Sequence, residues 1–371
     1  GSGIITTAMP MSHSGYLKLY QLRQPRLDVD YDVIMLDEAQ DTNPAIQDIV
    51  MRQQCAKIIV GDRHQAIYSF IGAEDALGSV CASRTLTLTR SFRFGFRIAS
   101  IANALLSYFT TERRTLIGLG QTPGIVLGLF DSTVAKNSYD EDRWWVWRKE
   151  QRRCPPKEKG TDYHQESYAV LSRTNATLFH VACALMRCHQ SFLMIGGVDS
   201  YKFEDILDTA RVCLGRHKDV VNPFLMRFES GTVLKRYADA TNDSEILSRL
   251  KVIQHCGGAE EVVRITKKLL LRAKAQESSL EPRQRGGADI AFLGTVHKAK
   301  GLEFDNVVLA DDYFSELMDV RFQSDVRHSK RGVVDEFNMI YVGVTRAKRR
   351  LRIGKSLKRF LLGSGMLTHI D

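Results

Sequence analysis

The sequence predicts an α/β protein with parallel sheets and a mostly helical insertion in its second half. Short apolar runs at 33–36 and 57–60 flank a helix that has a start signal at 41–44, an order typical of a βαβ unit. Residues 201–285 instead show successive amphipathic helical periods. Further strand-like apolar runs alternate with helical segments at 124–130, 168–171, 192–197 and 307–310.

Composition predicts a soluble globular chain of two or three domains. The 371 residues are 44% hydrophobic and 26% charged, and no apolar run approaches the ~20 residues of a membrane helix. The seven cysteines are scattered without a C-x-x-C pair, which predicts a reducing intracellular compartment and no zinc site. The net charge of +9 suits a polyanion and gives no reason to expect a membrane partner.

Two carboxylates follow the first predicted strand. We expect residues 33–36 to be buried on both faces and to present Asp37 and Glu38 at the carboxyl end of the strand, where open α/β sheets bind ligands. An Asp at this position can hold a Mg²⁺ ion that bridges phosphate oxygens, and a neighbouring carboxylate can orient or deprotonate a water molecule. The alternative is that both acids cap the next helix.

The second predicted strand, 57–60, ends in Gly61-Asp62, at the same edge of the sheet as the acidic pair. The amide of Gln65 lies just after this strand and can reach a terminal phosphate. Tyr68 and Phe70 can stack on unpaired bases. Ordinary core packing is the simpler explanation of the two aromatic residues when they are taken alone.

Residues 91–95 read Ser-Phe-Arg-Phe-Gly and precede a predicted helix. Phe92 is a candidate for stacking on adenine. Arg93 is a candidate contact to a γ-phosphate because a planar guanidinium matches phosphate oxygens, although in isolation it is an ordinary surface arginine. The basic run at 349–359 is either a solvated face or a surface that follows phosphates.

Six segments, in this order, resemble the motif series of UvrD-like superfamily-one DNA helicases. They are DEAQD at 37–41, GDRHQAIYSFIGA at 61–73, SFRFG at 91–95, LSRTNA at 171–176, TVHKAKGLEFD at 295–305 and YVGVTRAK at 341–348. The resemblance runs from about 13 to 360 and is weakest in 131–166 and 201–285. It implies two RecA-like parallel-sheet domains, the first incomplete. Their predicted bounds are 1–83 for the first and 84–200 with 289–371 for the second, around a helical insertion at 201–288.

The resemblance also implies ATP and Mg²⁺ as cofactors and gives five residues catalytic roles. Asp37 would bind Mg²⁺, and Glu38 would activate the attacking water. Gln65 would sense the γ-phosphate. Arg93 and Arg346 would be arginine fingers that stabilise the charge of phosphoryl transfer.

Other motif positions are implied to bind the nucleotide and the DNA. Phe92 would stack on adenine, and Gly301 and Glu303 would lie at the nucleotide, with Glu303 on the ribose. The residues expected to lie toward the single strand are Tyr68, Phe70, Arg173, Asn175, Thr295 and His297.

The resemblance implies an ATP-dependent 3′-to-5′ DNA helicase or translocase that acts on single-stranded DNA or DNA junctions in repair or recombination. Within the family, residues 15–22, SFRFG and LGTVHKAKGLEFD are most similar to the eukaryotic F-box helicases. This implies a nuclear protein with ubiquitin-ligase partners, held through a region outside this chain, since no F-box lies within it.

Two departures from the family pattern affect these expectations. Ser69 and Ile71 stand where the family often places Arg. More seriously, no G-x-x-x-x-G-K-[ST] phosphate loop is present. The Gly-Lys-Ser at 354–356 follows the TRAK motif and is not expected to open a helix after an early strand. We therefore expect an N-terminally truncated chain, with exposed apolar surface on its first sheet, that does not hydrolyse ATP by itself.

Two alternatives stay open at this point. A non-catalytic DNA-binding pseudo-helicase or scaffold could keep the fold without the phosphate loop, although it would not need to retain both acids and both arginines. An RNA helicase of the same superfamily is the second alternative.

Overall fold

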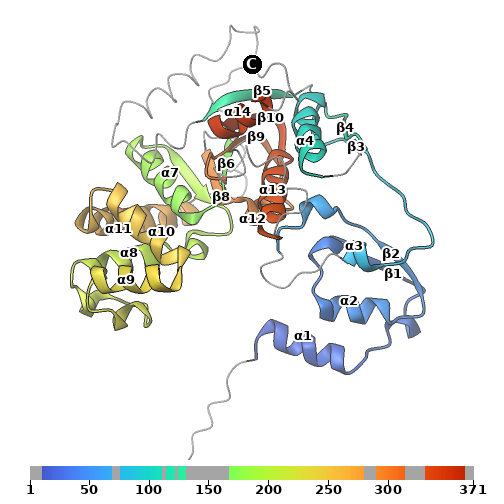
Figure 1. The fold of residues 1–371 in the computed structure, drawn as a ribbon, viewed down its shortest axis with the longest axis horizontal. Coiled ribbons are helices and arrows are strands. Elements are labelled where there is room, and N and C mark those ends of the chain that lie inside the picture. The colour runs from blue at the N-terminus through green and yellow to red at the C-terminus, as the bar shows by residue number, and fades with distance from the viewer. Residues whose placement is uncertain are drawn as a thin grey trace, which may run out of the picture. The chain divides into compact units, whose positions relative to one another are not determined.

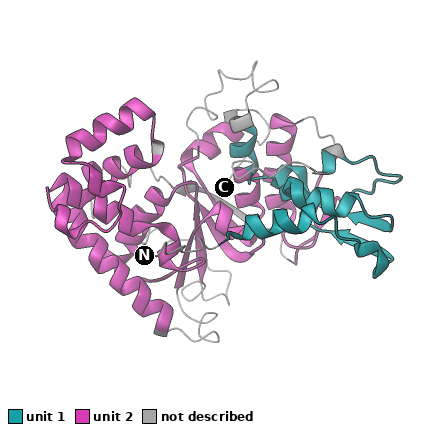
Figure 2. Ribbon diagram, turned by 90° about the horizontal axis from the view of Figure 1, so that it is seen from below, with its two compact units in different colours: residues 1–88, 334–338 teal, residues 89–333, 339–371 magenta. Residues whose placement is uncertain are grey.

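The computed structural model describes residues 11–68, 76–110, 114–121, 124–130, 167–279, 290–313 and 331–363. The chain forms two compact units, shown in Figure 2: unit 1 comprises residues 1–88 and 334–338, and unit 2 comprises residues 89–333 and 339–371. Each unit contains a parallel sheet, and the prediction of an α/β fold with parallel sheets is therefore confirmed.

Unit 1 is built around a short βαβ element. Strands β1 (Val33–Leu36) and β2 (Ala56–Ile59) pair in parallel, with α2 (Pro44–Met51) between them in the chain. The side chain of Asn43 caps α2 by accepting a hydrogen bond from the Ile46 amide at 3.0 Å. The other elements of the unit are α1 (His13–Leu22), η1 (Leu27–Val29), η2 (Ala39–Asp41), η3 (Arg63–Gln65) and α3 (Ala76–Ser79).

The prediction that residues 33–36 are buried on both faces is wrong. In β1, Val33 is 46% exposed and Met35 is 69% exposed. Ile58 in β2 and Val60 directly after this strand are also exposed. Exposed and partly buried residues alternate along both strands, so one face of this two-stranded sheet has no cover among the described residues. The exposed apolar surface expected on the first sheet is thus confirmed.

Unit 2 contains a six-stranded parallel sheet in the order β5-β10-β9-β6-β8-β7 (Figure 1). All five residues of the central strand β6 are buried, as expected for a strand covered on both faces. The strands are β5 (Ile125–Phe130), β6 (Tyr168–Ser172), β7 (Ser191–Met194), β8 (Ile290–Thr295), β9 (Phe304–Leu309) and β10 (Ala347–Gly354). A separate two-stranded sheet pairs β3 (Arg90–Ser91) with β4 (Ile117–Gly118).

Helices accompany the six-stranded sheet in the α/β order expected from the sequence. Helix α7 packs its apolar residues into the main hydrophobic core with β6, β7 and β8. The described helices that follow unit 1 in the chain and lie outside the insertion are α4 (Phe96–Phe109), α7 (Asn175–Arg187), α12 (Val296–Ala299), α13 (Arg331–Val344) and α14 (Lys355–Gly363), and residues 334–338 of α13 belong to unit 1.

The helices predicted within 201–285 are confirmed, and they gather as a group in Figure 1. They are α8 (Phe203–Cys213), α9 (Gly231–Thr241), α10 (Ser244–His255) and α11 (Ala259–Ser279), with short turns η5 (Val198–Tyr201), η6 (His217–Asp219) and η7 (Leu225–Arg227). Helices α8, α10 and α11 share the main core of the sheet, while α9 and η7 close a smaller core around Leu225 and Leu234. Among the described residues, no helix has the length and apolarity to cross a membrane.

Candidate functional site

The carboxyl ends of β1 and β2 carry the acidic residues predicted from the sequence. Asp37 follows β1 directly, and its Oδ1 atom accepts the backbone amide of Glu38 at 2.9 Å. Glu38 adopts the left-handed conformation with φ +50°, which turns the chain sharply into η2. Both carboxylates are exposed at this edge of unit 1.

Gln40 joins the two strand ends and was missed by sequence reasoning. Its side chain is 2% exposed, its Oε1 atom accepts the Asp62 amide at 3.0 Å, and its Nε2 atom donates to Glu38 at 2.5 Å. Gly61 leaves the space that this amide occupies. The sequence offered one signal for Gln40. Gly61 directly follows the second predicted strand, and Gln40 is the one amide within the acidic motif DEAQD that follows the first.

Gln65 lies on the same edge, as predicted. Its Nε2 atom donates to Asp62 Oδ2 at 2.9 Å, and the other oxygen of Asp62 accepts the His64 amide. Burial raises the pKa of Tyr68, and the negative charges of Asp41 and Glu38 raise it further. Tyr68 therefore lies within electrostatic range of Asp41 and Glu38. Ser69, Phe70 and Ile71 lie outside the described residues.

Unit 2 brings three of the motifs together around Arg93. Its Nε atom donates to Glu303 Oε2 at 2.9 Å, and its Nη1 atom donates to the Thr345 carbonyl at 3.2 Å. Lys348 lies 3.6 Å from the other oxygen of Glu303 and 3.4 Å from Asp305. The hydrogen bond from Arg93 lowers the pKa of Glu303. Residues from SFRFG, GLEFD and VTRAK therefore share one charged cluster.

Arg346 is held in the interior of unit 2. The side chain is 2% exposed and donates to the Val342 carbonyl at 3.0 Å, the Leu302 carbonyl at 3.4 Å and Thr345 Oγ1 at 3.1 Å. These bonds tie the end of α13 to the segment before β9. Arg346 is adjacent to the Arg93 cluster through Thr345, and its role as an arginine finger stays a prediction.

The structure places the two predicted DNA-facing pairs of unit 2 at neighbouring strand ends. Arg173 and Asn175 follow β6, Thr295 ends β8, and His297 lies in α12. Strands β6 and β8 are parallel partners with Ser172 opposite Thr295, so all four residues lie at the same edge of the sheet.

Asp312 fixes the loop that carries two of these residues, and sequence reasoning missed it. Its carboxylate accepts the amides of Arg173 and Thr174, each at 2.9 Å, and the Thr174 hydroxyl at 3.0 Å. Asn175 donates to the Tyr201 carbonyl at 3.3 Å. An acidic pair after the apolar run at 307–310 was the available signal.

Two segments of the chain match known protein families. Residues 11–77 match the family model of the UvrD/REP helicase N-terminal domain, and residues 244–358 match that of the UvrD-like helicase C-terminal domain. Both matched segments are those of the UvrD-like helicase family. The matched ranges contain the acidic pair and Gln65 in unit 1, and Glu303 and Arg346 in unit 2.

Two proteins with an F-box helicase name are similar over nearly the whole chain. F-box DNA helicase 1 of Gallus gallus is 34% identical over 95% of this chain and 31% of that protein. F-box DNA helicase protein 1 of Schizosaccharomyces pombe is 28% identical over 97% of this chain and 38% of that protein. The ATP-dependent DNA helicase UvrD1 of Mycobacterium tuberculosis is 22% identical over 90% of this chain and 56% of that protein. The chain thus spans roughly a third to a half of these relatives.

The Gly-Lys-Ser of this UvrD-like chain lies between a strand and a helix, because Gly354 ends β10 and Lys355 begins α14, but β10 is the last of the described strands and not an early one. The hydrogen-bond donors of this turn already bind a carboxylate of the same chain. The Ser356 amide and hydroxyl donate to the Asp311 carboxylate, the hydroxyl at 2.9 Å. A bound phosphate at this turn would face that carboxylate, so the geometry argues against a phosphate loop here.

Two of the residues predicted to hold a nucleotide, Phe92 and Gly301, have open surroundings. Phe92 is 76% exposed, so a face of its ring is open to a flat partner. Gly301 has φ +80° and no neighbouring atom within 4 Å of the position of a Cβ, which leaves room beside Glu303.

Asp37 fits Mg²⁺ as a single carboxylate ligand. Within the described ranges, no group of three or more His, Cys, Asp or Glu side chains is placed to hold a metal ion. Mg²⁺ commonly keeps several waters and binds one or two carboxylates together with substrate phosphates, and Asp37 suits such a site.

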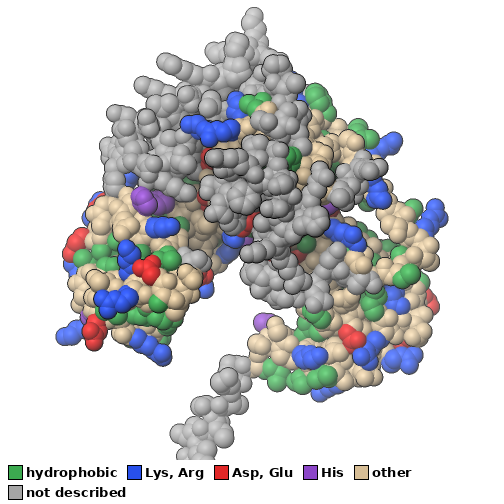
Figure 3. All heavy atoms as spheres, in the orientation of Figure 1, with side chains coloured by type: hydrophobic (Ala, Val, Ile, Leu, Met, Phe, Trp, Pro, Cys, Tyr) green, Lys and Arg blue, Asp and Glu red, His purple; other side chains and the backbone are tan. Residues whose placement is uncertain are grey.

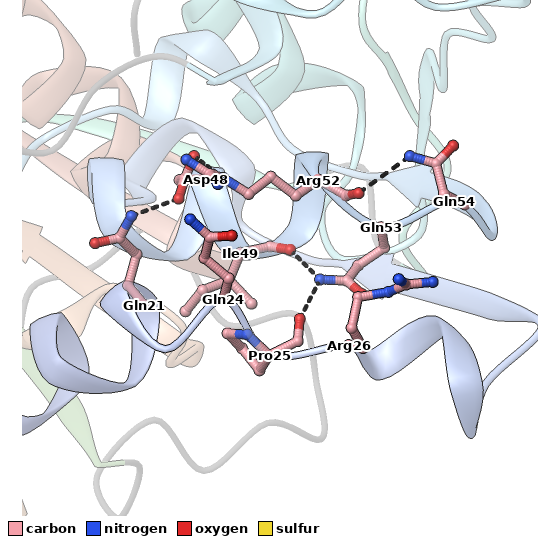
Figure 4. Close-up of a pocket in the computed structure, with 9 residues that line it drawn as sticks. All are labelled: Gln21, Gln24, Pro25, Arg26, Asp48, Ile49, Arg52, Gln53 and Gln54. Atoms are coloured by element: carbon pink, nitrogen blue, oxygen red, sulfur yellow. Dashed lines mark hydrogen bonds and ion pairs between the residues drawn. The ribbon is translucent and has the colours of Figure 1, made fainter.

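A surface pocket in unit 1 lies away from these motifs and is lined by the last turns of α1 and α2 and the segments that follow them (Figure 4). Gln53 crosses it, donating to the Pro25 and Ile49 carbonyls at 3.0 and 2.6 Å and accepting the Leu27 amide at 2.8 Å. Because this amide is used to hold the connection from α1 to β1, the pocket has a structural explanation and we assign it no ligand.

Proposed function

We propose that this chain is part of an ATP-dependent 3′-to-5′ DNA helicase or translocase that acts on single-stranded DNA or DNA junctions in repair or recombination. The observation that carries the proposal is the Arg93-Glu303 pair, which joins motifs 210 residues apart. Names of the similar proteins support DNA as the nucleic acid.

The proposed roles in hydrolysis divide between the two units. In unit 1, Asp37 contributes a carboxylate to Mg²⁺, Glu38 orients and deprotonates water, and Gln65 contacts the terminal phosphate. In unit 2, Phe92 stacks on the base, Gly301 leaves room for the nucleotide, and Glu303 binds the ribose. Arg93 and Arg346 supply positive charge to the transferring phosphoryl group. When bound, Mg²⁺ neutralises charge on the phosphate oxygens.

The isolated chain is expected to hydrolyse ATP at no significant rate, because its sequence has no G-x-x-x-x-G-K-[ST]. A phosphate-release assay with and without single-stranded DNA tests this on the exact polypeptide. Robust turnover that Glu38→Gln abolishes would contradict the expectation. Turnover that Glu38→Gln leaves unchanged would identify a contaminating enzyme.

DNA binding is the activity that this chain can be tested for directly. We propose that Tyr68, Phe70, Arg173, Asn175, Thr295 and His297 contact the strand. Binding of a fluorescein-labelled 20-nucleotide oligothymidylate should weaken steeply as salt rises, because phosphate contacts release counterions. Arg173→Ala should weaken it further, whereas Lys267→Ala, an exposed lysine of α11, should leave it unchanged. Equal losses in the two variants would contradict a contact at Arg173.

Two alternative functions can be tested separately. If the chain is a non-catalytic pseudo-helicase or scaffold, the longer protein that contains it will bind DNA without DNA-stimulated hydrolysis. If it acts on RNA, a 20-nucleotide oligouridylate will compete more strongly than oligothymidylate at fixed salt. We also propose a nuclear location and ubiquitin-ligase partners held outside this chain, which localisation and co-purification of the longer protein would test.

A further inference from the structure

Helix α9 and the loop before it expose a group of apolar side chains in the helical insertion. The group, called the α9 patch here, consists of Val221, Phe224, Met226, Val233 and Tyr237. Val221 is 75% exposed and Met226 is 50% exposed, and the other three are exposed as well. Figure 3 shows hydrophobic side chains beside Lys and Arg side chains over the helical insertion. Exposed apolar groups of this kind mark interaction surfaces when they are contiguous.

Aromatic ring contacts connect the loop to helix α9 within the α9 patch. Phe224 lies edge-on to Tyr237 with ring centroids 5.7 Å apart, and both lie 5.2 Å from the ring of Phe228. Val233 and Tyr237 are four residues apart on α9 and therefore share one side of the helix. The patch thus combines one face of α9 with the loop at 221–228.

Buried polar groups hold this loop in place. Asp208 in α8 is 2% exposed, and its Oδ2 atom accepts the amides of Val221 at 2.9 Å and Asn222 at 2.7 Å. Asn222 in turn donates to Asp205 at 2.9 Å and accepts the Phe224 amide at 3.0 Å. The exposed side chains are therefore presented by a fixed backbone, which lowers the entropy cost of binding a partner.

Two positive charges lie beside the patch, and one exposed acid, Glu229, follows Phe228 in the chain. Arg227 lies between Met226 and Phe228 in the chain, and Arg236 is three residues from Val233 on α9. Both are exposed, and neither pairs with a carboxylate in the part of the chain that the structure describes. Lys235 projects from the other side of the helix, because a step of two residues turns an α-helix by about 200°. Two guanidinium groups at an apolar surface favour an acidic partner.

We infer that the α9 patch is a docking surface for an acidic amphipathic helix of a separate partner protein. The apolar side of such a helix would cover the Phe224 and Tyr237 rings and Met226, and its carboxylates would meet Arg227 and Arg236. A nucleic-acid strand is the less favoured occupant. Val221, Met226 and Val233 offer no flat face to a base, and the rings pack edge to face instead of forming a stacking platform.

A peptide library panned on the whole chain tests this inference. Enriched peptides should carry apolar residues at i, i+3 or i+4 and i+7 with Asp or Glu between them. The tightest peptide is then labelled with fluorescein and titrated. Met226→Asp and the double change Arg227→Glu with Arg236→Glu should each weaken its affinity at least tenfold. The matched control, Lys235→Glu on the other side of α9, should change it less than twofold.

Every other outcome overturns the inference. These outcomes are a library without a binder, binders that lack acidic residues, and affinities that the patch variants leave unchanged. Displacement of the peptide by 20-nucleotide oligothymidylate, with loss of oligothymidylate binding in Met226→Asp, would assign the patch to nucleic acid. All substituted side chains are exposed, and circular dichroism must show the same helicity and thermal midpoint as the parent before affinities are compared.

Discussion

A Cβ atom on Gly61 would lie 2.4 Å from Oε1 of Gln40. Real Cβ atoms do not approach so closely, so any side chain at Gly61 forces the Gln40 amide to move. That amide makes the partly buried hydrogen bond to Asp62 and the contact to Glu38. The geometry of the acidic edge in unit 1 therefore depends on the absence of one methyl group.

Gly61→Ala should destabilise the chain by about 1–3 kcal/mol, because the displaced Gln40 leaves the partly buried Asp62 amide without its partner. Urea unfolding followed by circular dichroism measures the change. If the effect acts through Gln40, the double variant Gly61→Ala with Gln40→Ala will cost clearly less than the sum of the single variants. Additive losses would show that the clash acts elsewhere.

The Arg93-Glu303 pair should give unit 2 a small pH-dependent stability. The pKa of Glu303 is lower in the folded state, so the pair stabilises the fold above the unfolded pKa and loses this contribution as pH falls through the folded pKa. Both groups are partly exposed, so the contribution is at most about 0.2–1 kcal/mol. The parent should exceed Glu303→Gln in thermal midpoint at pH 7, and the difference should vanish at acid pH. Glu229→Gln, at an exposed position, should show no such trend.

Asp312→Asn should lower the free energy of unfolding by about 1–3 kcal/mol. The carboxylate offers two acceptor oxygens to the donors of Arg173 and Thr174, whereas the amide would offer one. The substitution should also weaken oligothymidylate binding by about five- to tenfold through a less ordered loop at Arg173 and Asn175, since each ~1.4 kcal/mol of binding energy is tenfold. Fluorescence anisotropy measures the affinity. Asp239→Asn on the exposed side of α9 is the control. A loss of stability with unchanged DNA affinity would make Asp312 purely structural.

Arg346→Ala should destabilise unit 2 by about 2–4 kcal/mol, since the Val342 and Leu302 carbonyls and Thr345 Oγ1 lose the donors of a buried guanidinium. Arg93→Ala, at a more exposed position, should cost less than about 1 kcal/mol. Urea unfolding of both variants provides the comparison. Equal losses in the free energy of unfolding would contradict a structural role for Arg346. If Arg346→Ala is strongly destabilised, a loss of ATPase activity in that variant does not by itself establish Arg346 as an arginine finger.

The local sequence pattern was sufficient to predict the strands and the family. The apolar runs at 33–36 and 168–171 specify strands through the preferences of neighbouring residues, and the six motifs occur in one fixed order. The degree of burial was not predictable in the same way. Met35 belongs to a run that suits a two-faced core, yet it is exposed because burial depends on which elements pack against each face of the sheet.

The sequence by itself determined which elements form and which chemical groups stand at the strand ends, namely Asp37 and Glu38 in unit 1 and Arg173 and Thr295 in unit 2. Only the tertiary structure decided which groups meet. Asp312 reaches the Arg173 amide across 139 residues because β9 pairs with β6, with Leu309 opposite Leu171. Such contacts depend on strand order and register, which arise from packing over the whole sheet, whereas helix and strand propensity acts between neighbours in the chain.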